Sequence, residues 1–148
     1  MAGQDLGRLY DEDLFVWACR NAQLLREGRY AEADMENIAE EIESLGKEQV
    51  HRLHSQIRRL LHHLLKYQYQ PGRRTRSWHL SLVNARIRIE RILEENPSLK
   101  PRIHELAVGA YREAVREAIV ETGLPKETFP AECPYTLQQI MDDEFLPE

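Results

Sequence analysis

Apolar residues recur every three or four positions through most of this chain, which is the spacing of an amphipathic helix. Four segments with this period are separated by Gly28, Pro71-Gly72, Pro97 and Gly123-Leu124-Pro125, residues that end or interrupt helices. The pattern predicts helices over about residues 11–27, 34–69, 77–95 and 98–122. No stretch alternates like a strand, so the predicted fold class is all-α, a four-helix bundle in a single domain over residues 1–148.

The second segment is unusually long, and its two apolar stripes nearly coincide at about 100° per residue. The stripes are Met35, Ile38, Ala39, Ile42 and Leu45, then Val50, Leu53, Ile57, Leu60, Leu61 and Leu64. A single helix of roughly 54 Å fits both. Gly46 lies on the same side and indicates either a close helix contact, which we favour, or a kink.

The remaining segments differ in the size of their apolar residues. The third places Trp78, Leu82, Ala85, Ile89, Ile92 and Leu93 on one side, and the fourth carries Ala107, Ala110, Ala114 and Ala118. Small residues let a neighbouring helix approach closely, and Gly123 is expected to close the fourth helix. Residues 124–148 hold four of the seven prolines but are too apolar for disorder. We expect this Pro-rich tail to wrap the bundle, with a short helix near Thr136 to Met141.

The net charge of −5 hides three blocks of opposite sign. Residues 1–48 carry 5 Lys/Arg against 12 Asp/Glu, residues 49–92 carry 10 against 1, and residues 93–148 carry 5 against 12. Such asymmetry indicates either a charged partner or acidic helices packed beside a basic one.

Composition places the chain among globular proteins outside the membrane, with 42% hydrophobic and 30% charged residues. The longest apolar run, Leu14 to Cys19, is far shorter than the ~20 residues of a membrane span. Residues 1–10 have no apolar core, so we expect no signal peptide. Cys19 and Cys133 lack metal-type spacing and indicate two reduced thiols in a cytoplasmic protein.

Several short motifs occur in an order that resembles a known family. They are EIESLG (41–46), HLLKYQYQP (63–71), RSWH (76–79), ENPSL (95–99), AYREA (110–114), ETGLP (121–125) and FPAECPYTLQQIMD (129–142). From about residue 10 to the end, the chain resembles the bacterial domain of unknown function 29 family; Tyr67 stands where that family is expected to have Trp. The resemblance implies a small all-helical bacterial protein and brings no activity, cofactor or catalytic residue.

The histidines raise the question of metal or catalytic chemistry. Glu48, His51 and His54 form one Glu-x-x-His motif with a neighbouring His, whereas a di-iron bundle needs two such motifs and further Glu ligands. Adjacent side chains diverge by about 100° on a helix, so we expect no functional pair from His62 with His63 or from Ser77 with His79. An acidic cluster could supply general acids or metal ligands, but a solvated helix face is the favoured interpretation; its members are Asp34, Glu36, Glu40, Glu41, Glu43 and Glu48. No phosphate-binding loop occurs. We expect no catalytic residues and no cofactor.

The stretch HHLLKYQYQPGRRTRSWH, residues 62–79, combines basic and aromatic residues around one Pro-Gly turn. Its candidate contact residues are Lys66, Tyr69, Arg73, Arg74 and Arg76, here called the basic turn. Arg beside aromatics is typical of nucleic-acid and phosphate-binding surfaces, but a pI of about 5.7 argues against a dedicated nucleic-acid binder.

The sequence therefore favours a non-enzymatic helical interaction or accessory module that contacts a protein partner, or a second copy of itself, through the basic turn. Two alternatives stay open. One is a nucleic-acid-associated protein that uses the same turn, and the other is a metal-dependent enzyme centred on Glu48, His51 and His54.

Overall fold

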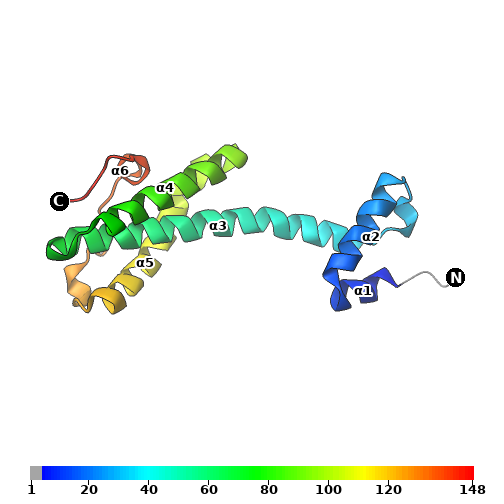
Figure 1. Ribbon diagram of the computed structural model, residues 1–148, viewed down its shortest axis with the longest axis horizontal. Coiled ribbons are helices and arrows are strands. Elements are labelled where there is room, and N and C mark those ends of the chain that lie inside the picture. The colour runs from blue at the N-terminus through cyan, green and yellow to red at the C-terminus, as the bar shows by residue number, and fades with distance from the viewer. Residues whose placement is uncertain (1–4) are drawn as a thin grey trace. The chain divides into compact units, whose positions relative to one another are not determined.

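A computed structural model describes residues 5–148 of the chain, and in this part the secondary structure is helical throughout, without strands (Figure 1). The all-α prediction is confirmed. The expectation that residues 1–10 hold no signal-peptide core falls partly on residues 1–4, which lie outside the described residues. None of the described helices is both long enough and apolar enough to cross a bilayer.

The helices are α1 (Leu6–Glu12), α2 (Leu14–Arg26), α3 (Met35–Tyr69), α4 (Arg76–Glu95), α5 (Ile103–Thr122) and α6 (Leu137–Met141). Single 3-10 segments follow α2, α3, α4 and α5 in turn: η1 (Tyr30–Glu32), η2 (Pro71–Arg73), η3 (Pro97–Arg102) and η4 (Lys126–Thr128). The chain divides into two compact units, residues 1–48 and residues 49–148.

The turn signals in the sequence place most helix ends correctly. α3 ends at Tyr69 because Pro71 disfavours helical geometry in the residue before it. Thr75 caps α4, its Oγ1 accepting a hydrogen bond from the Trp78 amide at 3.2 Å. Gly123 closes α5 in the left-handed region at φ 71°.

Two helix starts differ from the prediction. The expected helix over 11–27 is broken at Asp13, whose extended backbone ends α1 and whose carboxylate accepts from the Val16 amide at the start of α2. The expected helix over 98–122 begins at Ile103, because the stretch containing Pro97 and Pro101 forms η3 instead.

The first unit contains α1, α2, η1 and α3 as far as Glu48, and few of its side chains are buried. Trp17 and Asn21 are its buried residues in the described part of the chain. Trp17 Nε1 donates to Asp34 at 3.0 Å, and Asn21 accepts from the Asp34 amide at 2.8 Å. These bonds hold α2 against the residue that precedes α3, so polar contacts fix a unit that has little apolar core.

Gly46 lies within the unbroken helical span of α3, and a Cβ added to it would meet no atom within 4 Å. The close helix contact that we favoured at Gly46 is therefore absent from the described residues. The apolar stripe alone led to that expectation, and at Gly46 this side of α3 has open space beside it.

The second unit has an apolar core built from α3, α4, α5 and the C-terminal segment. Side chains of α3 that are fully buried include Leu53, Ile57, Leu60, Leu61, Leu64 and Leu65. The small residues Ala107, Ala110, Ala114 and Ala118 of α5 are buried as well, as their spacing predicts. Three of the four predicted bundle helices thus supply this core.

The C-terminal segment contributes to the same core through Phe129, Tyr135 and Ile140, which are buried. The Tyr111 hydroxyl donates to the Pro130 carbonyl at 2.6 Å, and the Tyr135 hydroxyl donates to Gln68 at 2.7 Å. α6 starts with a capping box formed by Thr136 and Gln139, close to the short helix predicted there.

Arg86 on α4 is a charged residue buried in the second unit, with 2% of its surface exposed, so its guanidinium needs hydrogen-bond partners inside the protein. Its guanidinium donates to the carbonyls of Ile140, Phe145 and Gln139 at 3.0, 3.0 and 3.1 Å. Burial lowers the Arg86 pKa, although Asp142 and Asp143 oppose the shift, and an arginine stays protonated at any physiological pH. One charged side chain therefore fixes the path of residues 139–145.

Replacing Arg86 by Met should lower the free energy of unfolding by about 2–4 kcal/mol, because one buried and two half-buried carbonyls lose their donor. Arg88, exposed on the same helix, provides the matched control, and Arg88→Met should change stability by less than about 0.5 kcal/mol. Urea denaturation of both variants measures this. Equal stabilities would mean that Arg86 does not hold the segment.

Candidate functional site

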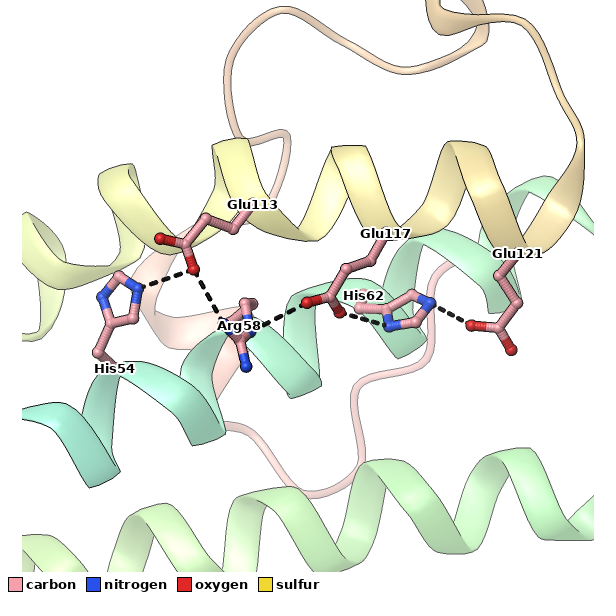
Figure 2. A network of polar contacts seen from close by, with 6 residues as sticks. All are labelled: His54, Arg58, His62, Glu113, Glu117 and Glu121. Carbon is pink, nitrogen blue, oxygen red and sulfur yellow. Dashed lines mark hydrogen bonds and ion pairs between the residues drawn. The ribbon is translucent and has the colours of Figure 1, made fainter.

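Helices α3 and α5 face each other along a row of charged and histidine side chains, which we call the α3–α5 seam. Its members are His54, Arg58, His62 and Lys66 on α3 and Glu113, Glu117 and Glu121 on α5. Both sets are spaced four residues apart, so each lies on one face of its helix. Figure 2 shows six of them, with Glu113 and Glu117 each directed between two partners on α3 and Glu121 directed toward His62.

The contacts of the seam alternate along the two helices. Glu113 lies 3.2 Å from His54 Nε2 and 3.1 Å from Arg58 Nη1. Glu117 lies 3.2 Å from Arg58 Nε and 3.1 Å from His62 Nδ1. These interlocked pairs set the register of α3 against α5.

At the end of the seam the residue on α3 is nearly buried. Lys66 Nζ donates to Glu121 at 2.5 Å, and the Lys66 side chain is 8% exposed. His62 Nε2 lies within ion-pair distance of the other Glu121 oxygen, without hydrogen-bond geometry. Burial alone raises the pKa of Glu121, but the bond from Lys66 and the charge of His62 outweigh it, so the pKa is lowered. Bonds from His54 and Arg58 likewise lower the pKa of Glu113.

His63 lies beside the seam without belonging to it. Its ring stacks on His62, with centroids 5.4 Å apart and planes 9° from parallel. Our expectation that these neighbours would not pair is wrong for the rings, because rotation about the side-chain bonds aligns what the Cβ positions separate. Burial, followed by the charges of His62, Lys66 and Arg59, lowers the His63 pKa to about 4.

The basic turn divides into residues with internal partners and residues without them. Lys66 lies in the seam and also 4.6 Å from the Trp78 ring centroid. Arg74 donates to the Tyr67 carbonyl at 2.7 Å and the Pro147 carbonyl at 3.3 Å, and it stacks on the Tyr67 ring. Tyr69 packs edge-on against Phe129.

Arg73 and Arg76 are exposed, and neither has an ion pair among residues 5–148. The sequence grouped Arg73 and Arg74 in one contact surface, the basic turn. Arg74 differs from Arg73, because the C-terminal segment returns to the turn and places the Pro147 carbonyl within reach of the Arg74 guanidinium. Sequence spacing gave no sign of that contact.

The metal alternative gains no support from the geometry. His54 directs Nε2 toward Glu113 on α5, and Glu48 lines a groove of the first unit described below. Across residues 5–148, no three His, Cys, Asp or Glu side chains are grouped so that they could hold a metal ion. Cys19 and Cys133 are free thiols, and burial raises the Cys133 pKa, which leaves that thiol protonated and a poor nucleophile.

The carboxylates of the seam were missed from the sequence. Their signal is the four-residue spacing of Glu113, Glu117 and Glu121, which matches the spacing of the basic and histidine positions on α3. Arg86 was missed too, although it follows Ala85 on the buried side of α4. A charged residue on a buried stripe predicts a polar partner in the core.

A groove in the first unit is the other candidate site. It has a volume of about 400 Å³ and lies between α2 and the first part of α3. Its lining residues are Trp17, Ala18, Asn21, Ala22, Leu25, Ile38, Glu41, Ile42, Ser44, Leu45 and Glu48. Ile42 and Leu45 are 65% and 60% exposed, so the apolar stripe of α3 is open to solvent here.

His63 predicts how stability depends on pH. Its pKa is about 4 in the folded chain and about 6.5 when unfolded, so the unfolded chain binds the proton first as pH falls. Stability from neutral His63 is complete above pH 6.5 and is lost toward pH 4, by about 1–2 kcal/mol after allowance for solvent screening.

His63→Gln should therefore reduce the loss of unfolding free energy between pH 6.5 and 4.5, as measured by urea denaturation at each pH. The exposed His79 serves as control, since His79→Gln should keep the wild-type slope. Parallel curves for the wild type and His63→Gln would contradict the assignment.

Comparison with known proteins yields one match. The family model described as "Domain of unknown function DUF29" matches residues 9–146, nearly the whole chain. No curated protein and no solved structure matches the chain.

Proposed function

The chain belongs to the DUF29 family, whose description names no activity, and we propose from the geometry that this protein is a non-enzymatic helical module that binds a protein partner. The observation that carries the proposal is the exposed apolar surface of the first unit. Seven large apolar side chains there are exposed, Leu14, Phe15, Val16, Tyr30, Met35, Ile42 and Leu45, while Trp17 and Asn21 are buried.

Exposed apolar residues on this scale indicate binding, because contiguous apolar surface is kept out of water unless a partner covers it. Two of these seven residues, Ile42 and Leu45, line one groove between two helices, and a helical groove is a common receptor for a partner helix. The polar bonds of Asp34 with Trp17 and Asn21 hold the groove in place before any partner arrives, which lowers the entropy cost of binding.

The carboxylates of the α3–α5 seam are poorly placed to act as catalytic groups. Each of its carboxylates is already held by two basic or histidine side chains, so a reaction would have to break ion pairs that join α3 to α5. This arrangement supports a structural role for the seam.

Two features predicted from the sequence are retained as proposals. The Pro-rich segment 124–148 is proposed to wrap the helices of the second unit, supported by buried Phe129 and Ile140 and by the three carbonyls bonded to Arg86. The four-helix bundle is likewise retained as a proposal, with the helices predicted over about 11–27, 34–69, 77–95 and 98–122 as its members; the core that α3, α4 and α5 share supports three of them.

Affinity purification tests the binding proposal with three tagged proteins: wild type, Ile42→Asp and Val120→Asp. Ile42 lines the groove, whereas Val120 is an exposed apolar residue of α5. A partner identified by mass spectrometry and then rebound in purified form should be retained by the Val120→Asp protein and lost by Ile42→Asp. Equal binding to all three proteins would contradict the proposal.

The basic turn is proposed as a second contact, reduced to Arg73 and Arg76, for an anionic surface of the partner. The double variant Arg73→Glu/Arg76→Glu should keep the wild-type melting temperature, since exposed charges contribute at most about 1 kcal/mol, yet bind the purified partner more weakly. Arg74→Glu should instead lower the melting temperature, because Arg74 bonds two carbonyls.

Unchanged partner binding by the double variant would remove the turn from the interface. The alternative anionic partner, nucleic acid, is tested with the same double variant by titration with DNA and RNA across salt. Tight wild-type binding with a steep salt dependence, lost in the variant, would favour that alternative.

A further inference from the structure

The groove of the first unit combines an apolar lining with acidic charge. Glu41 and Glu48 are its charged lining residues, and no lining residue is basic. The Tyr10 hydroxyl donates to one oxygen of Glu41, which leaves the second oxygen for another donor. Residues 5–48 carry 12 Asp/Glu against 5 Lys/Arg, so the surroundings of the groove are also acidic.

We propose that this groove binds a basic amphipathic helix of a partner protein, an inference that rests on the proposed function. The apolar stripe of the partner helix lies against Ile42 and Leu45, and Lys or Arg residues beside that stripe reach Glu48 and the free oxygen of Glu41. α2 has 13 residues and is therefore roughly 20 Å long, which accommodates about four turns of a partner helix.

Charge complementarity selects this occupant over a second copy of the chain that docks through the same groove. Pairing two copies through the groove would bring together two units with the same acidic excess, and like charges at an interface disfavour association. A basic helix gains both apolar burial and attraction to Glu41 and Glu48. Attraction of this kind is weakened by salt.

The probe is an acetylated and amidated 18-residue peptide of Leu and Lys, with its leucines at helical three-and-four spacing, titrated against the full chain by isothermal titration calorimetry. A peptide with Glu in place of every Lys is the charge control. We expect the Lys peptide to bind, with affinity falling as salt rises, and the Glu peptide not to bind.

Two aspartate variants separate groove binding from simple charge attraction. Leu45 lines the groove at 60% exposure, and Leu80 lies on α4 at 58% exposure. Both Leu45→Asp and Leu80→Asp make the protein more acidic, so attraction alone would strengthen both. We expect Leu45→Asp to weaken binding at least about tenfold, because the leucine contact is lost, and Leu80→Asp to bind at least as well as the wild type.

Glu48→Lys tests the acidic edge separately, with an expected loss of affinity that shrinks at high salt. The circular dichroism spectra of all variants should match the wild type, since the replaced residues are exposed. Equal binding of both peptides, or Leu45→Asp binding no weaker than Leu80→Asp, would overturn the proposal. Sedimentation showing a wild-type dimer that Leu45→Asp dissociates would also overturn it, because a second copy would then occupy the groove.

The groove as an interface and the basic helix as its occupant are tested by separate outcomes. If Ile42→Asp loses the native partner but the Lys peptide does not bind, the groove is an interface and the basic helix is wrong. If Ile42→Asp keeps the partner and the Lys peptide does not bind, both the interface and its occupant are wrong.

Discussion

The first unit is governed by how little apolar surface two short helices can bury by themselves. Trp17 is shielded there, whereas Ile42 and Leu45 on α3 stay in contact with water. A unit of this size gains little hydrophobic stabilisation, because burial rises with chain length. Hydrogen bonds between Asp34 and two residues of α2, Trp17 and Asn21, hold α2 beside the start of α3 where a large apolar core is missing. A groove is left that is formed in advance and lined by side chains without a partner.

The second unit, in contrast, buries its apolar side chains against one another. Its core combines leucine and isoleucine side chains of α3 and α4 with the alanine stripe of α5 and apolar residues of the C-terminal segment. Arg86 ties that segment to α4 through three carbonyls, and the α3–α5 seam joins two helices along their outer side (Figure 2). Charged residues that the sequence singles out, such as Lys66 of the basic turn and His54, therefore make contacts that stabilise the fold.

Helix content and most helix ends could be predicted, because they depend on local signals such as Pro71, Thr75 and Gly123. The break at Asp13 depends on a single side chain accepting a backbone bond, which periodicity does not reveal. Arg74 and Arg86 both donate to backbone carbonyls of residues 139–147. Since every residue has a backbone carbonyl, the sequence does not indicate which one accepts such a bond. The basic turn was therefore predicted as one surface, although Lys66 and Arg74 contact the protein interior and Arg73 and Arg76 do not.

Hydrogen exchange followed by mass spectrometry tests the central claim, that the groove is the binding surface, most directly. The full chain is compared with and without the Lys peptide at saturation, and exchange is followed for the amides of each helix. The account predicts slower exchange in residues 17–25 of α2 and 38–48 of α3, with α4 unchanged. Protection confined to residues 71–80, or no added protection in α2 and α3, would contradict it.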